Sequence, residues 1–323
     1  MLLNIRPFRK GFDEETFVRI FNAAFSDYDD IRSMTLEGMK KMFEAPSFNT
    51  DGLFIAEWNG EAAGMVDALV DKLRKEEKGI IEWLAVLPRF RGNGIAKKLV
   101  EEALESFKQR SIKVVDAWAQ SDREGCVHIF ESFGFKPARV TSMMKRSLRD
   151  ISLDIHGNDE ATIREACLED QNEITLINRL YNDAFQEHFN YRPKPLEETK
   201  YFLLEIPWFK NGRTFFAIMD NKPVGFVVGG IDEELNKEKN LRYGWILEVG
   251  VLKAYRRKGV GARLMLHMMR VLKAQGMEDV LLYVDEMNPT EAKRLYEKLG
   301  FEAARKNIIY RKLLAQQAYP SHI

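Results

Sequence analysis

At 323 residues the chain is long enough for two domains of about 150 residues, each with its own hydrophobic core. Apolar residues make up 45% and charged residues 30%, as in soluble globular proteins, and Lys plus Arg balance Asp plus Glu at 49 each. This balance argues against a nucleic-acid or anionic-membrane partner, and the two isolated cysteines, Cys126 and Cys167, argue against a disulfide framework and a metal site.

The N-terminal residues lack the pattern of a signal peptide, and no apolar run approaches the ~20 residues that a membrane helix needs. We therefore expect a cytoplasmic protein with no membrane partner. The sequence leaves the oligomeric state open.

The first half begins with a predicted strand at Ile5-Arg6, and an amphipathic helix follows, with apolar residues at helical spacing from Phe17 to Phe25. Asn59-Gly60 then separates two apolar runs and predicts a hairpin. The remaining elements expected in this half are a strand at 80–86, a helix at 95–107, a strand at 112–118, a short helix and, after Phe133-Gly134-Phe135, a final strand.

The second half repeats this order after a predicted linker at 149–160. Its elements are a strand at Ile163-Arg164, a helix over 174–185, a hairpin that turns at Asp220-Asn221, a strand at 245–251, a helix at 260–273, a strand at 280–284, a short helix and a last strand. The charged run 232–240 is interpreted as a solvated hairpin tip.

Two landmarks occur in both halves of the sequence. Arg91 and Arg256 begin similar glycine-containing segments, and Gly134 and Gly300 each precede a phenylalanine in a similar turn. The offset along the chain is the same for the two pairs to within one residue. This agreement predicts a duplicated domain, with copies at 1–150 and 161–315. The element order predicts an α+β fold of three layers in each copy: a mixed, mostly antiparallel sheet flanked by helices.

The glycine-containing segment joins a buried strand to a helix in both halves. Such a turn leaves backbone amides without partners at the positive end of the helix dipole, and an anion such as a pyrophosphate can bind there. A Walker P-loop is excluded, because no Gly-x-x-x-x-Gly-Lys-Ser/Thr occurs, and neither copy completes the Rossmann Gly-x-Gly-x-x-Gly. The plain alternative is a tight turn with solvated arginines.

Both segments fit the pattern Arg/Gln-x-x-Gly-x-Gly/Ala, as Arg91-x-x-Gly94-x-Ala96 and Arg256-x-x-Gly259-x-Gly261. This pattern resembles the acyl-CoA pyrophosphate loop of the GCN5-related N-acetyltransferase (GNAT) family, and the segment 295–301 resembles the family's last helix and turn. The resemblance covers nearly the whole chain as two tandem copies. It implies a V-shaped cleft in each sheet, acetyl-CoA as co-substrate, and direct acetyl transfer to a small-molecule or peptide amine.

The resemblance also assigns residues to the acetyl-CoA site. In the second half these are Val249, Gly250 and Val251 on the strand, Arg256, Arg257, Lys258, Gly259, Val260, Gly261 and Ala262 in the loop, and Asn288 for the pantetheine arm. Their first-half counterparts are Val86, Arg91, Gly92, Asn93, Gly94, Ile95 and Ala96. The gap from Asn288 to Tyr296 is one residue longer than is usual in the family.

The resemblance makes Tyr296 the general acid that protonates the departing thiolate, the alternative being a tyrosine that only packs its ring. The corresponding residue of the first half is Phe130, which cannot donate a proton. We therefore expect chemistry in the second half and a catalytically degenerate first half.

The general base is less well defined by sequence. Glu248, on the strand before the loop, is the candidate, but it lies three residues before Val251, and an ion-paired strand carboxylate is an equal alternative. Glu82 has the better strand parity, but it belongs to the half without the tyrosine. A water-relayed base and an amine that binds already neutral stay open, and His128 is interpreted as a surface residue.

Apolar walls for the acceptor are expected from five aromatic residues of the second half, namely Phe185, Phe189, Tyr191, Trp208 and Trp245. The alternative from a different class is a non-enzymatic acyl-CoA-binding or scaffold protein.

Overall fold

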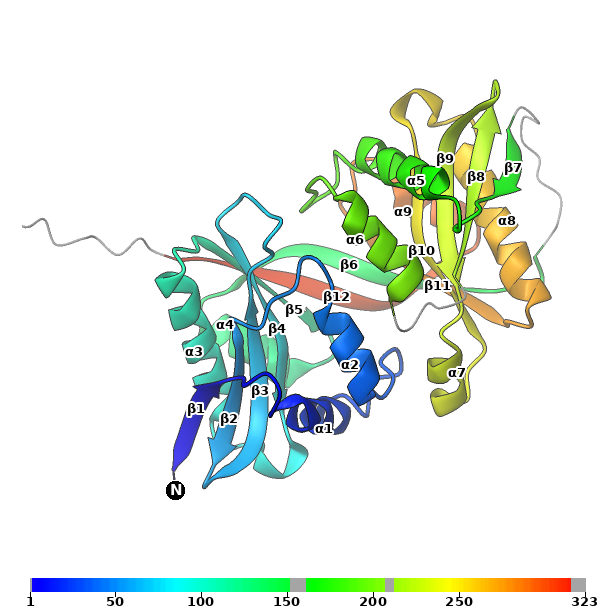
Figure 1. The fold of residues 1–323 in the computed structure, drawn as a ribbon. Helices are drawn as coiled ribbons and strands as arrows, with labels where there is room; N and C mark the ends of the chain where they lie inside the picture. Colours follow the sequence, from blue (N-terminus) through cyan, green and yellow to red (C-terminus); the bar gives the residue numbers. More distant parts are fainter. Residues whose placement is uncertain (1, 152–160, 207–211, 315–323) are drawn as a thin grey trace, which may run out of the picture. The chain divides into compact units, whose positions relative to one another are not determined.

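A computed structural model describes residues 2–151, 161–206 and 212–314 (Figure 1). The chain forms two compact units. The first unit contains the residues up to Arg139 together with those from Asn307 onward, and the second unit contains Val140–Lys306.

The first unit follows the predicted element order up to α4, with α2 as a helix that was not predicted. Its elements are β1 (Leu3–Pro7), α1 (Glu14–Ala24), α2 (Leu36–Phe43), β2 (Leu53–Trp58), β3 (Glu61–Leu69), β4 (Lys78–Val86), η1 (Pro88–Phe90), α3 (Ile95–Gln109), β5 (Val114–Gln120) and α4 (Glu124–Ser132). The strands pair in the order β1-β2-β3-β4-β5, antiparallel except for the parallel pair β4–β5.

The second unit repeats this arrangement. Its elements are β7 (Thr162–Glu165), α5 (Gln171–Ala184), α6 (Leu196–Lys200), the π-helix η2 (Tyr201–Glu205), β8 (Arg213–Met219), β9 (Lys222–Gly230), α7 (Glu233–Lys239), β10 (Tyr243–Val251), η3 (Lys253–Tyr255), α8 (Val260–Ala274), β11 (Asp279–Asp285) and α9 (Ala292–Lys298). Helices α5 and α8 pack on opposite faces of its sheet, so the unit has the three predicted layers.

The last strand of each sheet comes from the other repeat. Strand β6 (Lys136–Ser147) follows α4 along the chain, yet its residues Thr141–Ser147 pair with β11 in the second unit. Strand β12 (Glu302–Leu313) follows α9, yet Asn307–Leu313 pair with β5 in the first unit. The predicted limits, 1–150 and 161–315, follow the sequence repeat, whereas the compact units exchange these strands.

Both predicted hairpins are present, and their turns explain why these residues form them. Asn59 and Gly60 have φ of +50° and +84°, and Asp220 and Asn221 have φ of +49° and +58°. Two consecutive residues with positive φ make a turn whose twist matches that of the flanking strands, and Asn, Asp and Gly tolerate this conformation best.

The predicted hairpin tip at 232–240 is wrong, because Glu233–Lys239 form helix α7. The Asp232 side chain accepts a hydrogen bond from the Leu235 amide at 2.9 Å and caps the helix, while Leu235 is buried. Asn240 ends the helix with φ of +53°. The run was interpreted by its charges alone, whereas Asp232 and Asn240 cap a helix at its two ends and the buried Leu235 anchors it.

Strands β10 and β11 are paired only where they begin, over Tyr243–Trp245. Beyond that point β10 continues along β9 to Val251, with an irregularity between Ile246 and Glu248. The side of β10 that faces β11 is therefore without a strand partner near Val249 and Gly250, where the cleft was predicted.

Candidate active site

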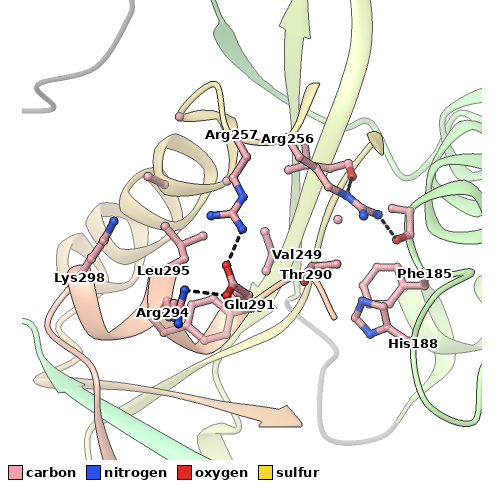
Figure 2. Close-up of a pocket in the computed structure, with 18 residues that line it drawn as sticks. Phe185, His188, Val249, Arg256, Arg257, Thr290, Glu291, Arg294, Leu295 and Lys298 are labelled. Carbon is pink, nitrogen blue, oxygen red and sulfur yellow. Dashed lines mark hydrogen bonds and ion pairs between the residues drawn. The ribbon is translucent and has the colours of Figure 1, made fainter. Parts of the chain in front are cut away.

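A cavity of about 500 Å³ lies in the second unit, where β10 separates from β11 (Figure 2). The end of α5, the splayed part of β10, the loop before α8, and α9 together form its walls. Its lining consists of Ala184, Phe185, His188, Val249, Gly250, Val251, Arg256, Arg257, Gly259, Gly261, Ala262, Thr290, Glu291, Ala292, Arg294, Leu295, Tyr296 and Lys298.

Arg256 holds the loop in place. Its guanidinium donates to the Val251 carbonyl at 3.1 Å and the Ala184 carbonyl at 2.8 Å, and it pairs with Glu187 at 2.7 Å. These bonds tie the end of α5 to the end of β10. The same geometry recurs at Arg91, which donates to the Val86 and Ala24 carbonyls at 3.2 and 3.3 Å. The first arginine of each loop therefore fixes the loop to the end of the preceding strand and to the end of a helix.

The loop itself exposes backbone amides. The first backbone bond of α8 runs from the Arg263 amide to the Gly259 carbonyl at 3.1 Å, and no acceptor among the described residues takes the amides of 257–262. Gly259 has φ of +82°, and Arg257 has φ of +65°, which for a residue with a Cβ stores about 1 kcal/mol or more. Partnerless amides at the positive end of a fifteen-residue helix form a cradle for an anion.

Charged side chains surround the mouth of the cavity. The Glu291 carboxylate pairs with Arg257 and with Arg294, each at 2.6 Å, and Lys298 lies on the same rim (Figure 2). The hydrogen bond from Arg257, followed by the charge of Arg294, lowers the pKa of Glu291. The rim thus carries an excess of positive charge that suits a phosphate-bearing ligand.

Tyr296 lies on α9 and lines the cavity. The side chain is buried, and the centres of the Tyr296 and Phe301 rings lie 6.1 Å apart. Burial raises the pKa of the Tyr296 phenol, which therefore stays protonated at neutral pH. Its hydroxyl has no hydrogen-bond partner among the residues that the structure describes. A protonated phenol without a protein partner can donate its proton to a ligand.

The first unit has a similar cavity of about 520 Å³. Its lining consists of Ala24, Phe25, Asp27, Tyr28, Leu84, Ala85, Val86, Phe90, Arg91, Gly92, Gly94, Ile95, Ala96, Lys97, Arg123, Glu124, Gly125, Cys126 and Ile129. Gly92 and Gly94 adopt positive φ, like Arg257 and Gly259 in the second unit. Phe130 is instead buried against Phe135 and Tyr310 and does not line the cavity.

Glu248 lies outside the lining of the second cavity. Its carboxylate pairs with the Lys194 ammonium at 2.8 Å, and both side chains are mostly buried. The ammonium also lies 3.5 Å from the centre of the Tyr181 ring. This environment corresponds to the ion-paired alternative for Glu248.

Asn288 also lies outside the lining, because its side chain is used locally. Its Oδ1 accepts from the Thr290 amide at 2.9 Å and from the Thr290 hydroxyl at 2.7 Å. Thr290 lines the cavity in its place. The one-residue longer gap before Tyr296 accompanies this local turn.

Three further predicted loop residues point elsewhere. Lys258 places its ammonium 5.3 Å from the centre of the Tyr255 ring, and Val260 is buried under α8. Asn93 of the first unit donates to the Phe90 carbonyl at 3.1 Å. These three residues do not line the cavities, and their backbone amides have no acceptor among the described residues.

Of the aromatic residues expected to wall the acceptor, Phe185 lines the cavity. Trp245 is buried and stacks on Tyr283, with the ring centres 6.1 Å apart. The Tyr191 hydroxyl donates a hydrogen bond to the Asn182 carbonyl at 3.2 Å. Trp208 lies outside the described residues.

Sequence reasoning missed His188, which lines the cavity just beyond the end of α5. Its ring packs on that of Phe185 at 4.5 Å. Aligning the two repeats could have found it, because the offset that relates Tyr181 to Phe21 also relates His188 to Tyr28. Tyr28 lines the first cavity, so both repeats place a titratable ring at this position.

No helix within residues 2–151, 161–206 and 212–314 is both long and apolar enough to cross a membrane. Within the same ranges, His, Cys, Asp and Glu side chains do not gather in threes where a metal ion could bind.

Sequence comparisons agree with the duplicated architecture. The family model described as "Acetyltransferase (GNAT) family" matches twice, over residues 15–135 and 176–301. A mycothiol acetyltransferase of Thermomonospora curvata is 30% identical over 69% of this chain and 69% of its own length. That of Nocardia farcinica is 27% identical over 79% of this chain and 81% of its own length.

Solved structures share the fold over nearly the whole chain. A tandem GNAT protein from the clavulanic acid biosynthesis pathway has a TM-score of 0.74 at 16% identity and covers 99% of this chain and 100% of its own. A GCN5-related N-acetyltransferase from Sphaerobacter thermophilus has a TM-score of 0.69 at 21% identity, with 96% and 95% covered. With both repeats matched by the family model, the chain belongs to the GNAT family and is an N-acetyltransferase with two tandem GNAT regions.

Proposed function

We propose that the chain transfers an acetyl group from acetyl-CoA directly to an amine, and that the reaction takes place in the C-terminal repeat. The observation that carries this proposal is one cavity that combines an amide cradle at the start of α8 with the partnerless phenol of Tyr296. In this proposal the pyrophosphate binds the amides of 257–262, and the rim residues Arg257, Arg294 and Lys298 add charge.

The acetyl end of the cofactor would extend along the splayed part of β10. The backbone groups of Val249–Val251 on the side away from β9 have no strand partner, since β10 pairs with β11 only over Tyr243–Trp245. They are available to the amides of the pantetheine arm and to the thioester carbonyl.

The reaction itself then needs two proton transfers. The amine nitrogen attacks the thioester carbon, and a tetrahedral oxyanion forms as the amine gives up a proton. Collapse of this intermediate breaks the carbon–sulfur bond, and the Tyr296 hydroxyl protonates the departing thiolate. The products are an N-acetylated acceptor and CoA, with no covalent enzyme intermediate.

The N-terminal repeat is proposed to bind acetyl-CoA or CoA without transferring the acetyl group. It keeps an amide cradle after Gly92 and Gly94 and a cavity of similar size, which support binding. It has Phe130 where the acid belongs. The non-enzymatic acyl-CoA-binding alternative thus applies to this repeat.

The acceptor is proposed to be a small-molecule amine, with a peptide amine as the alternative. The relatives named mycothiol acetyltransferase support the small-molecule acceptor, because that name describes acetylation of a small molecule. Glu248 stays in the proposal as a residue beside the acceptor region, where its pairing with Lys194 orders the segment before α6.

The direct test is Tyr296→Phe, with release of CoA thiol measured over a panel of small primary amines and a peptide with a free N terminus. Loss of the acid should lower kcat by about 10²–10⁴ while acetyl-CoA affinity is retained. Tyr310→Phe is the control, since Tyr310 is a buried tyrosine of the first unit, outside both cavity linings. If Tyr296→Phe turned over every active amine at the wild-type rate, the proposed role of Tyr296 would be wrong.

A further inference from the structure

We propose that His188 is the general base of the second unit, and that it takes the proton from the attacking amine directly or through one water. This inference rests on the proposed function and deepens it, because it names the group that accepts the proton which the amine nitrogen loses as the amide forms. Four features of the structure lead to it.

The first feature is location. His188 and Tyr296 line one cavity but come from different elements, His188 from the segment after α5 and Tyr296 from α9. Figure 2 shows His188 and Phe185 on one wall and Leu295 and Lys298 of α9 on the opposite wall. An acid for the sulfur and a base for the amine are needed on the two sides of the reacting carbon, and separate walls allow this arrangement.

The second feature is the freedom of the ring nitrogens. The backbone of His188 is fixed, since its amide donates to the Phe185 carbonyl at 2.9 Å and its carbonyl accepts from the Tyr191 amide at 3.1 Å. The ring packs on Phe185 at 4.5 Å. Neither ring nitrogen has a hydrogen-bond partner among the described residues, so a lone pair is available to a ligand.

The third feature is charge. Burial lowers the pKa of His188, and the Arg256 guanidinium lowers it further, while Asp285 and Glu187 act in the opposite direction. Arg256 is held beneath the loop by its bonds to the Ala184 and Val251 carbonyls, so its charge stays near the imidazole. Glu187 is itself paired with Lys253 and Arg256, which weakens its opposing effect. The imidazole is therefore neutral at pH 7 and ready to accept a proton.

The fourth feature is the lack of a competitor. Among the described residues that line this cavity, the only carboxylate is Glu291, and two arginines hold it at the rim. Glu248 lies outside the lining and is paired with Lys194. His188 is the one lining group there that can gain a proton near neutral pH without breaking an ion pair.

The first unit supports the assignment by contrast. Tyr28 takes the place of His188, with the Arg123 guanidinium 4.1 Å from its ring centre, and burial raises the pKa of its phenol. Phe130 takes the place of Tyr296. The repeat that lacks the acid therefore lacks the base as well, which is expected if the two residues serve one reaction.

The experiment is the pH dependence of kcat at saturating acetyl-CoA, with the most active amine of the panel, for wild type, His188→Gln and His188→Ala. In the wild type, kcat should rise with pH through an apparent pKa below 6.5 and then level off. The kcat of His188→Gln should no longer rise with pH in this range and should be lower than that of the wild type by a factor of about 10²–10⁴. Its affinity for acetyl-CoA, measured by calorimetry, should be unchanged. Added imidazole should restore part of the rate to His188→Ala.

The matched control is His267→Gln. His267 lies on α8 in the same unit, packs on Phe215 at 4.4 Å, and does not line the cavity. It should keep both the acid limb and the rate within about twofold. A His188→Gln enzyme that keeps the acid limb while Tyr296→Phe is impaired would overturn the base assignment and leave the proposed function standing. If Tyr296→Phe is also fully active, both proposals are wrong.

Discussion

At the scale of single residues, the sequence predicts the proposed acid, Tyr296, but not the proposed base, His188. Tyr296 could be predicted because the segment 295–301 resembles the last helix and turn of the GNAT family, and the repeat then identifies Phe130 as its counterpart. His188 could not, since one histidine after a helix carries no pattern until the fold places it on a cavity wall. The roles of Arg256 and Asn288 depend on carbonyl and hydroxyl partners that only the folded chain brings near them.

Arg256 has a stabilising role that can be measured. Its guanidinium makes charge-assisted bonds to two backbone carbonyls and to Glu187 while remaining mostly buried. Arg256→Ala should lower the free energy of unfolding of the second unit by about 1.5–3 kcal/mol. Arg256→Lys should restore little, because an ammonium cannot reach the three acceptors in this fork.

Chemical denaturation of the two variants beside the wild type checks this expectation. Arg91→Ala is the matched change in the first unit, where the two carbonyl bonds are longer. It should destabilise less than Arg256→Ala. Equal stability of Arg256→Ala and wild type would contradict the stabilising role of Arg256.

We expect Glu291 to compete with acetyl-CoA for the rim arginines. In the structure it pairs with Arg257 and Arg294, both of which face the cavity. Glu291→Gln should release them and tighten acetyl-CoA binding by a few-fold, as read by calorimetry at low salt. The gain should shrink as ionic strength rises, and a weaker affinity would show that the carboxylate orients the arginines for the ligand.

Asp67 predicts an unusual pH dependence for the first unit. It is fully buried, neither carboxylate oxygen has a hydrogen-bond partner among the described residues, and it lies opposite Glu82 across β3 and β4. Burial, then the neighbouring Glu82, raises the pKa of Asp67, and burial raises that of Glu82. At pH values between the unfolded-state and folded-state pKa of these carboxyls, the folded chain binds more protons than the unfolded chain. The stability of the first unit is therefore greatest below the unfolded-state pKa and falls as the pH rises through the folded-state pKa.

Asp67→Asn should therefore stabilise the first unit at pH 8, by about 1–3 kcal/mol, and much less at pH 4. Thermal denaturation across this pH range measures the effect. Asp279→Asn provides the control, because Asp279 is paired with Lys145 and partly exposed. A wild-type stability that rises from pH 4 to 8 more steeply than that of Asp67→Asn would contradict the sign.

At the scale of elements, local patterns predict the strands, the hairpins and most helices, because each depends on residues close in sequence, but α2 and α6 were not predicted. The capped helix α7 was missed because its signals, Asp232 and Asn240, lie inside a run of charges. The exchange of β6 and β12 was missed for another reason. From sequence, each strand is expected to be the last strand of its own repeat. The choice between the two sheets depends on pairing with distant residues, which no local pattern predicts.

The strand exchange makes a clear prediction about where damage will appear. Tyr310, on β12 of the second repeat, is buried in the first unit against Phe130. Tyr310→Ala should cost about 3–5 kcal/mol and speed hydrogen exchange in β5, which pairs with β12. The matched change Met144→Ala, on β6, should instead speed exchange in β11. Faster exchange in β11 for Tyr310→Ala would contradict the exchanged arrangement.

At the scale of the whole molecule, the chain combines two units with similar cavities and unequal chemistry. Both cavities are lined by a loop whose backbone amides have no acceptor among the described residues, and both loops are held by an arginine at the same position. They differ at the two positions proposed for proton transfer, with His188 and Tyr296 in one and Tyr28 and Phe130 in the other.

The most direct test of this account is acetyl transfer by the paired variants Gly94→Glu and Gly259→Glu. Both glycines have positive φ and open space where a Cβ would stand, so the two changes strain the backbone alike and place a carboxylate at each amide cradle. Transfer by Gly259→Glu should fall by at least about a hundredfold, while Gly94→Glu should keep most of the wild-type rate. Transfer that survives in Gly259→Glu and is lost in Gly94→Glu would put the chemistry in the first unit and contradict the account.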